Sequence, residues 1–492
     1  MKKFVIPTVI AAFFTALAAV SCILPEEEKG NFWATNFVSD TYYKVDAELI
    51  ASNELCEVWV EKNKGVTAEQ AERVAQEYKN VVYAKLMAVL GWNKVITLTG
   101  DDGVNVSMTM NTMQWADYLG DNNGKLTILL LDIKDGYTNE NGMYVAGYFD
   151  PYNYFSDYLV QTQVGGRSNE CDMIYMDINP VNIDNPAWEF FGTLAHEMQH
   201  LMNFATKILY YDESGSQGAD IYSDTWLDEG LSSAAEYIYS GEVNEGRLRD
   251  YNEDNSGFLS IGDNFFLWDN YKNIDESLVL NDYATVSLFF QWLRLHYGEG
   301  IYGDIFRSTY TDYRAITAAT SVGWTKLFSD WHIANYVQDP SGIHGYKNDP
   351  VLKNVKAHYL RYIAENVYNL YPGEAVYSYA GDVQGTLPNG TGTLWYAGLS
   401  SSGYTNSNIP AGGALLSFNS DTNKKGALKS AAITGIAPPL ASVNTANNSR
   451  SVSGAQPFSY RIDAGDLMGR DRFGRVTGMP GLKHLQIGPV SE

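Results

Sequence analysis

The sequence predicts an α+β protein in which a mixed β-sheet lobe, a helical lobe and a β-rich module follow one another. Up to about residue 205, short extended segments alternate with helical patterns, and from there to about 370 helical patterns dominate. After Pro372 the chain becomes rich in Gly, Ser, Asn and Thr, and short alternating runs replace the helical ones. With 492 residues, of which 45% are hydrophobic, the chain can bury a large core and form two or more domains.

Residues 1–21 have the pattern of an export signal peptide. Two lysines precede an apolar run from Phe4 to Val20, and small residues close that run. The run is short for a membrane span, so we expect it to be removed rather than retained as an anchor. The sequence thus predicts a protein that works outside the cytoplasm.

Cys22 follows this signal directly, and the small residue before it resembles the lipobox of bacterial lipoproteins. The resemblance implies a lipid on Cys22 that anchors the protein to a bacterial membrane or cell surface. Ala19 stands where the lipobox prefers Leu, so cleavage by an ordinary signal peptidase, followed by secretion, is the alternative. The acidic stretch at 22–36 is expected to act as a tether.

Composition narrows the partners of the protein. The formal net charge of −24 at pH 7 argues against nucleic acid, because phosphate binding requires a basic face. Three cysteines do not make a disulfide scaffold, and no C-x-x-C pair is present for zinc. If Cys22 carries a lipid, Cys56 and Cys171 are left as a pair that could form a disulfide in an oxidising compartment. The sequence does not indicate an oligomeric state.

Four segments account for the first lobe. Residues 39–61 alternate in the manner of extended strands. Residues 67–90 predict a helix, because a capping box opens the segment and apolar residues recur at helical spacing. Residues 125–132 and 171–177 are apolar runs beside turn residues, and they predict buried strands.

The next helix, which Pro186 opens, contains the motif His196-Glu197-Met-Gln-His200. Two histidines four residues apart project from the same face of an α-helix and can bind one metal ion. Glu197 is adjacent and can handle a proton beside that ion. The chain has only seven histidines, so this motif is improbable by chance. The alternative is a surface helix with exposed or capping histidines.

Helical patterns continue around 224–241, 282–297, 324–335 and 355–365. A catalytic zinc site needs three protein ligands and one open position, so a third ligand must come from another element. The carboxylates of the helix at 224–241 are the candidates for this ligand.

Trp226-Leu-Asp-Glu229-Gly-Leu within this helix closely resembles the W-L-N-E-G box of gluzincin metallopeptidases, as in the aminopeptidase N family. Together with the histidine motif and the export signal, the chain most resembles the hyicolysin family of bacterial neutral metallopeptidases. The resemblance covers about 125–300. It implies a thermolysin-like domain at 37–370, with a β/α lobe at 37–205 and a helical lobe at 206–370. Residues 371–492 remain a β-rich module without an assigned role.

The resemblance implies a role for each motif residue. His196, His200 and Glu229 would hold one catalytic zinc ion, and Glu197 would be the general base. Asp228 stands where the family box has Asn, which adds a charge and leaves the ligand intact.

Two further residues match the aminopeptidase pattern. Glu236 would orient a zinc-bound histidine by a hydrogen bond, and a solvent-facing helical Glu is the alternative. Tyr283 would steady the oxyanion during catalysis. In gluzincins the strand before the motif helix is a sheet edge that binds extended substrate, and 173–177 stand in that position. An ordinary core strand is the alternative there.

These residues predict a zinc-dependent endopeptidase that hydrolyses peptide bonds in polypeptide substrates. An aminopeptidase is less favoured, because the G-x-M-E-N box that grips a free amine is missing. A catalytically inactive surface lipoprotein or adhesin is the other alternative. The Asp-rich and Asn-rich loop at 132–142 could offer oxygen ligands to Ca²⁺, although it lacks the twelve-residue loop pattern.

Overall fold

The computed structural model describes most of the chain from Gly30 to Asn423. The described residues are 30–99, 104–139, 144–184, 187–210, 222–254, 259, 262–268, 279–360, 370–379, 385–390, 392–423, 469–470 and 476–477. The predicted signal peptide, Cys22 and the first part of the tether lie outside these ranges. Within the described ranges, no helix combines the length and hydropathy that a membrane span requires.

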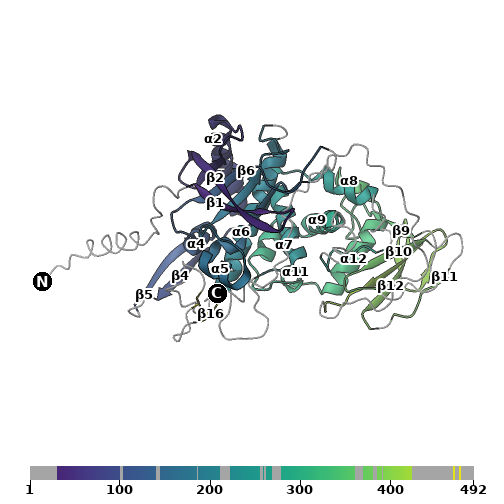
Figure 1. The fold of residues 1–492 in the computed structure, drawn as a ribbon. Coiled ribbons are helices and arrows are strands. Elements are labelled where there is room, and N and C mark those ends of the chain that lie inside the picture. The colour runs from purple at the N-terminus through teal and green to yellow at the C-terminus, as the bar shows by residue number, and fades with distance from the viewer. Residues whose placement is uncertain are drawn as a thin grey trace.

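A six-stranded mixed sheet forms the N-terminal part of the fold, at the upper left of Figure 1. In spatial order its strands are β1 (Asn31–Asn36), β2 (Thr41–Ser52), β3 (Cys56–Glu61), β6 (Leu126–Leu131), β8 (Met173–Asp177) and β7 (Gly147–Phe149). The strands β3, β6 and β8 run parallel, and the outer pairs run antiparallel. Every residue of β6 and β8 is buried, as expected for central strands covered on both faces. The predicted α+β class is confirmed.

The prediction that Met173–Asp177 is an edge strand is wrong. This strand, β8, pairs with β6 on one side and with β7 on the other. The short segment Gly147–Phe149 lies in a Gly- and Tyr-rich stretch that carried no strand signal, and its antiparallel pairing moves the sheet edge outward by one strand. The backbone of β8 is therefore not open to strand addition.

Helices cover this sheet. The predicted helix at 67–90 is present as α2 (Ala68–Glu77), a π-helical turn η2 (Tyr78–Val82) and α3 (Tyr83–Val89). Its capping box forms as expected at Thr67. The other helical elements of this lobe are α4 (Thr112–Leu119), η3 (Pro151–Tyr154), α5 (Asp157–Val164) and the motif helix α6 (Ala187–Tyr210). A separate hairpin of β4 (Asn93–Thr99) and β5 (Asn105–Asn111) extends to one side (Figure 1).

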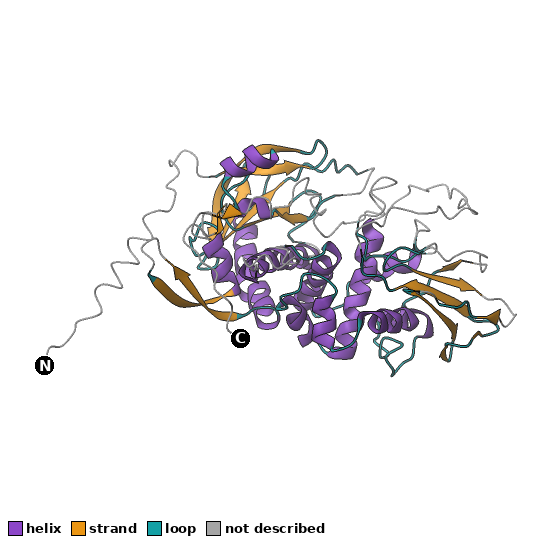
Figure 2. Cartoon of the chain, turned by 90° about the horizontal axis from the view of Figure 1, so that it is seen from below, coloured by secondary structure: helices purple, strands orange, loops and turns teal. Residues whose placement is uncertain are grey.

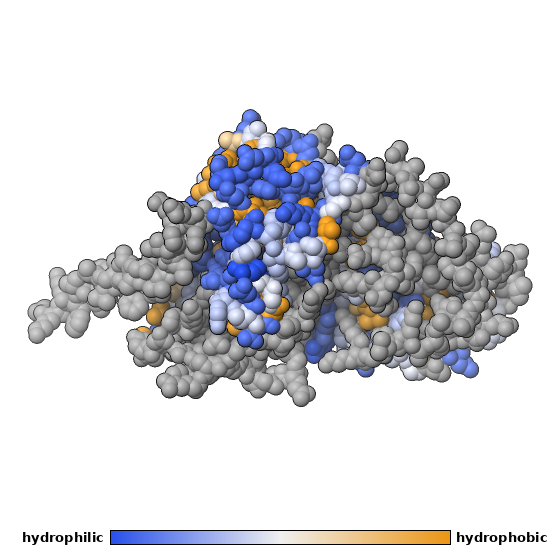
Figure 3. Space-filling model, viewed as in Figure 1, coloured by the Kyte–Doolittle hydropathy of each residue, from blue (hydrophilic) through white to orange (hydrophobic). Residues whose placement is uncertain are grey.

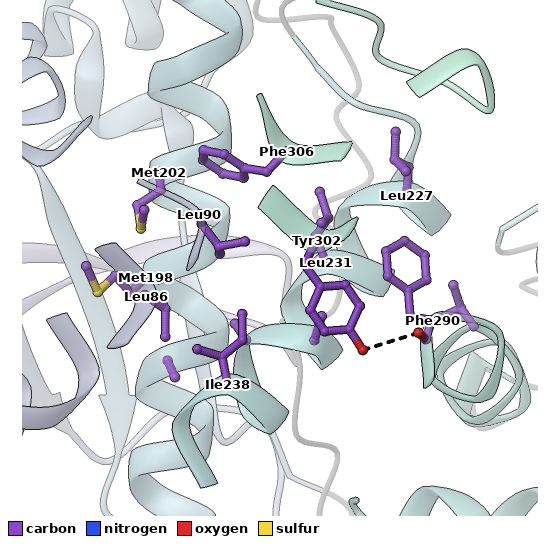
Figure 4. Close-up of a cluster of buried hydrophobic side chains, with 14 of the residues drawn as sticks. Leu86, Leu90, Met198, Met202, Leu227, Leu231, Ile238, Phe290, Tyr302 and Phe306 are labelled. Carbon is purple, nitrogen blue, oxygen red and sulfur yellow. Dashed lines mark hydrogen bonds between the residues drawn. The ribbon is translucent and has the colours of Figure 1, made fainter. Parts of the chain in front are cut away.

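The middle of the molecule is helical, with strands at either end (Figure 2). Its helices are α7 (Thr225–Ser240), α8 (Glu245–Glu253), α9 (Val279–Tyr297), α10 (Gly300–Phe306), α11 (Arg314–Thr320) and α12 (Trp324–Val337). Met198 and Met202 of α6 belong to the same buried cluster as Leu231 of α7 (Figure 4). A β-carbon at Gly230 would lie 2.1 Å from Cε2 of Phe290, so only glycine permits this close approach of α7 and α9.

A second sheet of five strands lies beyond the helices. Its spatial order is β13 (Gly403–Thr405), β12 (Leu394–Ser400), β15 (Ala414–Asn419), β10 (Ala375–Tyr379) and β9 (Tyr359–Leu360). Small pairs join β11 (Gly385–Thr386) with β14 (Asn408–Ile409) and β16 (Gly469–Arg470) with β17 (Val476–Thr477). The sheet packs on α12, where the Tyr377 hydroxyl donates a 2.7 Å hydrogen bond to the His332 carbonyl.

The predicted helix at 355–365 is wrong in its first part. A 3-10 turn, η5 (Leu352–Asn354), ends before it, and Tyr359 and Leu360 pair in parallel with β10. Pairing with a distant strand outweighs the local helical pattern here. Residues 361–369 lie outside the described ranges, and the domain boundaries remain predictions.

The face of the β-sheet lobe in Figure 3 is largely hydrophilic, in keeping with the net charge of −24. Cys56 and Cys171 are both buried and both free, so the structure contains no disulfide between them.

Candidate metal centre

Helix α6 presents both motif histidines on one face. The ring centroids of His196 and His200 lie 4.9 Å apart, as the four-residue spacing predicts. Both side chains are buried, and Glu197 between them has no exposed surface. The opposite face of α6 carries apolar residues of the main core, among them Leu194 and Leu201. Core packing therefore fixes the rotation of the helix, and this rotation points the imidazoles at α7.

Helix α7 supplies the third donor. Oε2 of Glu229 lies 3.2 Å from Nε2 of His196 and 3.7 Å from Nε2 of His200. The three side chains form a group whose donor atoms all lie within 4.8 Å of one another. Two donors that bind a tetrahedral ion at about 2.0–2.1 Å lie about 3.3 Å apart, so these distances suit one zinc ion.

Unpaired polar atoms point to the same conclusion. Nε2 of His196 and Oε2 of Glu229 are buried, and neither atom has a hydrogen-bond partner. A buried polar atom without a partner costs about 1–3 kcal/mol, so such atoms indicate a missing partner. Two imidazoles and one carboxylate form a donor set that zinc prefers in catalytic sites. These residues therefore fit the metal that the motif implies.

Each histidine is held by a second carboxylate at its other ring nitrogen. Nδ1 of His196 lies 2.9 Å from Oε1 of Glu236, which places an N–H at Nδ1 and leaves Nε2 for a metal. Glu236 also accepts a 2.9 Å hydrogen bond from Asn244 and lies 3.8 Å from Nη2 of Arg247. The predicted site residue Glu236 is thus buried against a ligand and does not face solvent.

His200 has the equivalent arrangement with Asp228, which the sequence interpretation missed. Nδ1 of His200 lies 2.9 Å from Oδ2 of Asp228. The other oxygen of Asp228 accepts hydrogen bonds from Asn203 at 2.7 Å and from Gln199 at 3.3 Å. One feature of the sequence indicates this role. Asp stands at position 228, where the family box has Asn, and its added negative charge is next to Glu229.

The carboxylates around His196 and His200 favour positive charge at the two imidazoles. Burial alone lowers the pKa of His196, but the carboxylates of Glu229 and Glu236 beside its ring nitrogens outweigh burial and raise this pKa to about 10. Burial also lowers the pKa of His200, and the carboxylates of Asp228 and Glu229 raise it to about 9. The surrounding carboxylates thus favour positive charge at both rings. A divalent cation supplies the same charge at the same place.

Tyr283 lies beside the third ligand. Its hydroxyl donates a 3.1 Å hydrogen bond to Oε1 of Glu229, and the Arg247 guanidinium lies 4.7 Å from the centre of its ring. Burial raises the pKa of Tyr283 well above its usual value, and the charge of Glu229 adds to this. The tyrosine is therefore a hydrogen-bond donor that orients Glu229, and its role toward an oxyanion stays a prediction.

In the loop at 132–142, which could offer oxygen ligands to Ca²⁺, both aspartates already have protein partners. Asp132 forms a 2.8 Å ion pair with Lys64 and accepts a hydrogen bond from Asn179. The carboxylate of Asp135 accepts backbone N–H groups of Tyr137 and Val145. Residues 140–142 lie outside the described ranges.

Two histidines from one helix and a glutamate from the next, each with a hydrogen bond to a further side chain, form a donor set that occurs in the zinc centres of metallopeptidases. A comparison of sequences supports a relationship to this class. The chain is 24% identical over 339 residues to the neutral metalloprotease ShpI of Staphylococcus hyicus. The alignment covers 66% of this chain, and it spans 66% of the length of that relative. No protein-family model matches the chain.

Proposed function

We propose that this protein is an extracytoplasmic zinc-dependent endopeptidase. The observation that carries the proposal is the group of His196, His200 and Glu229, with donor atoms within 4.8 Å of one another and Glu197 on the same helix. The similarity to a relative named neutral metalloprotease supports it independently of the geometry.

A bound zinc ion would lower the pKa of a coordinated water to about 7 and polarise the scissile carbonyl. His196, His200 and Glu229 hold the ion in this proposal, and Glu236 and Asp228 keep the two imidazoles oriented. Glu197 takes up the proton of the attacking water and passes it to the leaving amine. Tyr283 holds Glu229 in place through its hydroxyl and is a candidate to stabilise the oxyanion.

The finer assignments rest on resemblance. We propose a thermolysin-like gluzincin domain at 37–370, with lobes at 37–205 and 206–370, and a separate module at 371–492. Polypeptides are the proposed substrates, cut within the chain because the amine-binding box of aminopeptidases is missing. Export by the segment at 1–21 and a lipid on Cys22 would place the enzyme at a bacterial membrane or cell surface.

The test compares wild type with Glu197→Gln, which keeps all three ligands and removes the base. Zinc content by elemental analysis and casein hydrolysis are measured on the same preparations. We expect about one zinc ion per chain in both proteins and a loss of hydrolysis in the variant of at least about a hundredfold.

Equal hydrolysis in the two proteins would overturn the mechanism. Zinc binding without hydrolysis by wild type would favour the alternative of an inactive surface lipoprotein or adhesin. Zinc that stays bound in Glu229→Ala would refute the choice of third ligand.

A further inference from the structure

Three aspartates meet at a place that the metal centre does not use. Asp117 lies near the end of α4, Asp121 lies in the turn that follows, and Asp172 directly precedes β8. Each offers one carboxylate oxygen, and these oxygens all lie within 4.8 Å of one another. Acidic clusters at a surface are common without an ion, so the cluster alone is not sufficient evidence.

Asp172 supplies the second observation. Its side chain is only 1% exposed, and both carboxylate oxygens are buried without a hydrogen-bond partner. Burial of an ionised carboxylate is costly unless a counter-charge compensates for it. Asp172 is therefore a buried side chain whose partner is missing, and it faces two other carboxylates.

The turn that contains Gly120 and Asp121 lies very close to Asp172. A β-carbon at Gly120 would lie 2.7 Å from the backbone nitrogen of Asp172 and 3.0 Å from its Oδ1. Any other residue at this position would push the turn and its carboxylate away from Asp172. Glycine at position 120 thus permits the turn to lie close enough for the three aspartates to meet.

The two outer aspartates are already oriented by the turn. Oδ1 of Asp117 accepts a 2.8 Å hydrogen bond from the backbone of Gly124, and Asp121 accepts 2.7 Å and 3.4 Å bonds from Asn123. These amide donors fix the carboxylates and leave lone pairs for a further partner. Over the described part of the chain, none of the three aspartates forms an ion pair with a basic side chain. The nearby Lys125 instead contacts Ser52 and Glu57.

We propose that Asp117, Asp121 and Asp172 bind a calcium ion that ties the end of α4 to the start of β8. The donors of this group are three carboxylates, which favour a hard cation over zinc. Calcium binds oxygen at 2.3–2.6 Å, so oxygens on opposite sides of the ion lie about 5 Å apart, which accommodates the separations here. Water completes the shell on the exposed side.

The competing explanation is a shared proton. Burial raises the pKa of Asp172 well above its usual value, and burial with the nearby Asp117 raises that of Asp121 to about 7. A proton could therefore neutralise the cluster in place of an ion. The two explanations differ in their response to calcium, which a shared proton does not require.

The calcium ion would stabilise the position of α4 and β8 relative to the motif helix α6. Strand β8 leads toward α6, and α4 packs on α6 through a 2.8 Å hydrogen bond from the Trp115 indole to the Ala205 carbonyl. This role does not depend on peptidase activity, so its failure and the failure of the proposed function can be told apart.

The experiment uses the zinc-loaded full chain after removal of calcium. Calcium is titrated by calorimetry, and thermal unfolding is followed with and without calcium, for wild type, Asp121→Asn and the control Asp304→Asn. Asp304 is an exposed residue of α10 that pairs with Arg307. Asp121 lies in a turn, so its substitution is the one least disruptive to folding, and Asp172→Asn serves as a second variant.

We expect saturable calcium binding and a higher unfolding midpoint in wild type and Asp304→Asn, with zinc content unchanged. In Asp121→Asn the affinity should fall at least about tenfold and the calcium-dependent shift should disappear. The same variant should unfold at a higher temperature than wild type in calcium-free buffer, because one repelling charge is gone. Wild type that shows no calcium-dependent shift, or Asp121→Asn that keeps the full shift, overturns the proposal in favour of the shared proton.

Discussion

Substitution of Glu236 by Gln tests whether the carboxylate beside Nδ1 of His196 raises the affinity of the site for zinc. The two side chains have nearly the same volume, so the buried site, where Glu236 is 8% exposed, keeps its packing. The change replaces a charged acceptor of the 2.9 Å bond at His196 Nδ1 with a neutral one. It also leaves the guanidinium of Arg247, which is 4% exposed, facing a neutral amide.

The expected magnitude follows from these contacts. Loss of an outer partner of a metal-bound histidine costs about 10–100-fold in metal affinity, or about 1.4–2.7 kcal/mol. The Gln carbonyl still accepts from Nδ1, so we expect the lower half of this range. Removal of the whole side chain in Glu236→Ala should reach the upper half, because His196 Nδ1 then loses its acceptor and the 3.8 Å ion pair with Arg247 is lost as well.

The assay is a competition for zinc against a chelator of known affinity, with casein hydrolysis at saturating zinc as a second readout. Glu242→Gln is the matched control, because Glu242 follows the same helix and is exposed. If Glu236→Gln folds normally and binds zinc as tightly as wild type, the assigned role of the carboxylate is refuted.

Three further outcomes are expected. Gly230→Ala should lower the free energy of unfolding by about 1–3 kcal/mol, because the new methyl group would overlap Phe290. Thermal unfolding measures this effect. An unchanged unfolding midpoint would contradict the close packing of α7 on α9. Burial lowers the pKa of His332 to about 3. As the pH falls below about 6.5, this imidazole therefore takes up a proton in the unfolded state before it does so in the folded state. The free energy of unfolding should then decrease by about 1.4 kcal/mol per pH unit down to about pH 3. His332→Phe should remove that part of the acid sensitivity in unfolding curves between pH 7 and pH 4, and an identical slope in the two proteins would count against it. Chelation of zinc should lower the unfolding midpoint of wild type and of Glu197→Gln equally, since both keep the ligands; a chelator without effect on the midpoint would show that zinc does not bind the folded state.

Local spacing predicts two donors of the candidate metal centre, and resemblance to a known box predicts the third. The four-residue interval between His196 and His200 fixes their common face on any α-helix, and the box around Glu229 identified the partner helix through resemblance. The structure brings these three residues together, with Glu236 and Tyr283 in contact with them.

The predictions that were wrong or missing concern features that depend on contacts between distant segments of the chain. Neither the sequence of β7 nor that of Tyr359–Leu360 reveals the strand beside which it lies. The sequence alone therefore predicts β8 at the edge of its sheet and a helix where Tyr359 and Leu360 form a strand. The role of Asp228 depends on the packing of α7 against α6, which no spacing rule provides. Periodicity reports which face of an element is buried and leaves its neighbour undetermined.

The three carboxylates that contact the ring nitrogens of the motif histidines, those of Asp228, Glu229 and Glu236, belong to the single helix α7, and both histidines belong to α6. The ion would therefore add a link between two helices that packing and hydrogen bonds, such as that from Asn203 to Asp228, already hold together. Any partial opening that separates them would destroy the binding site. If the protein binds zinc as proposed, a molecule that releases the ion would lose this link, and its opened form would expose more backbone. For a peptidase, neighbouring molecules that still hold zinc can then cut the opened one, so the supply of zinc would set both its rate of catalysis and its lifetime.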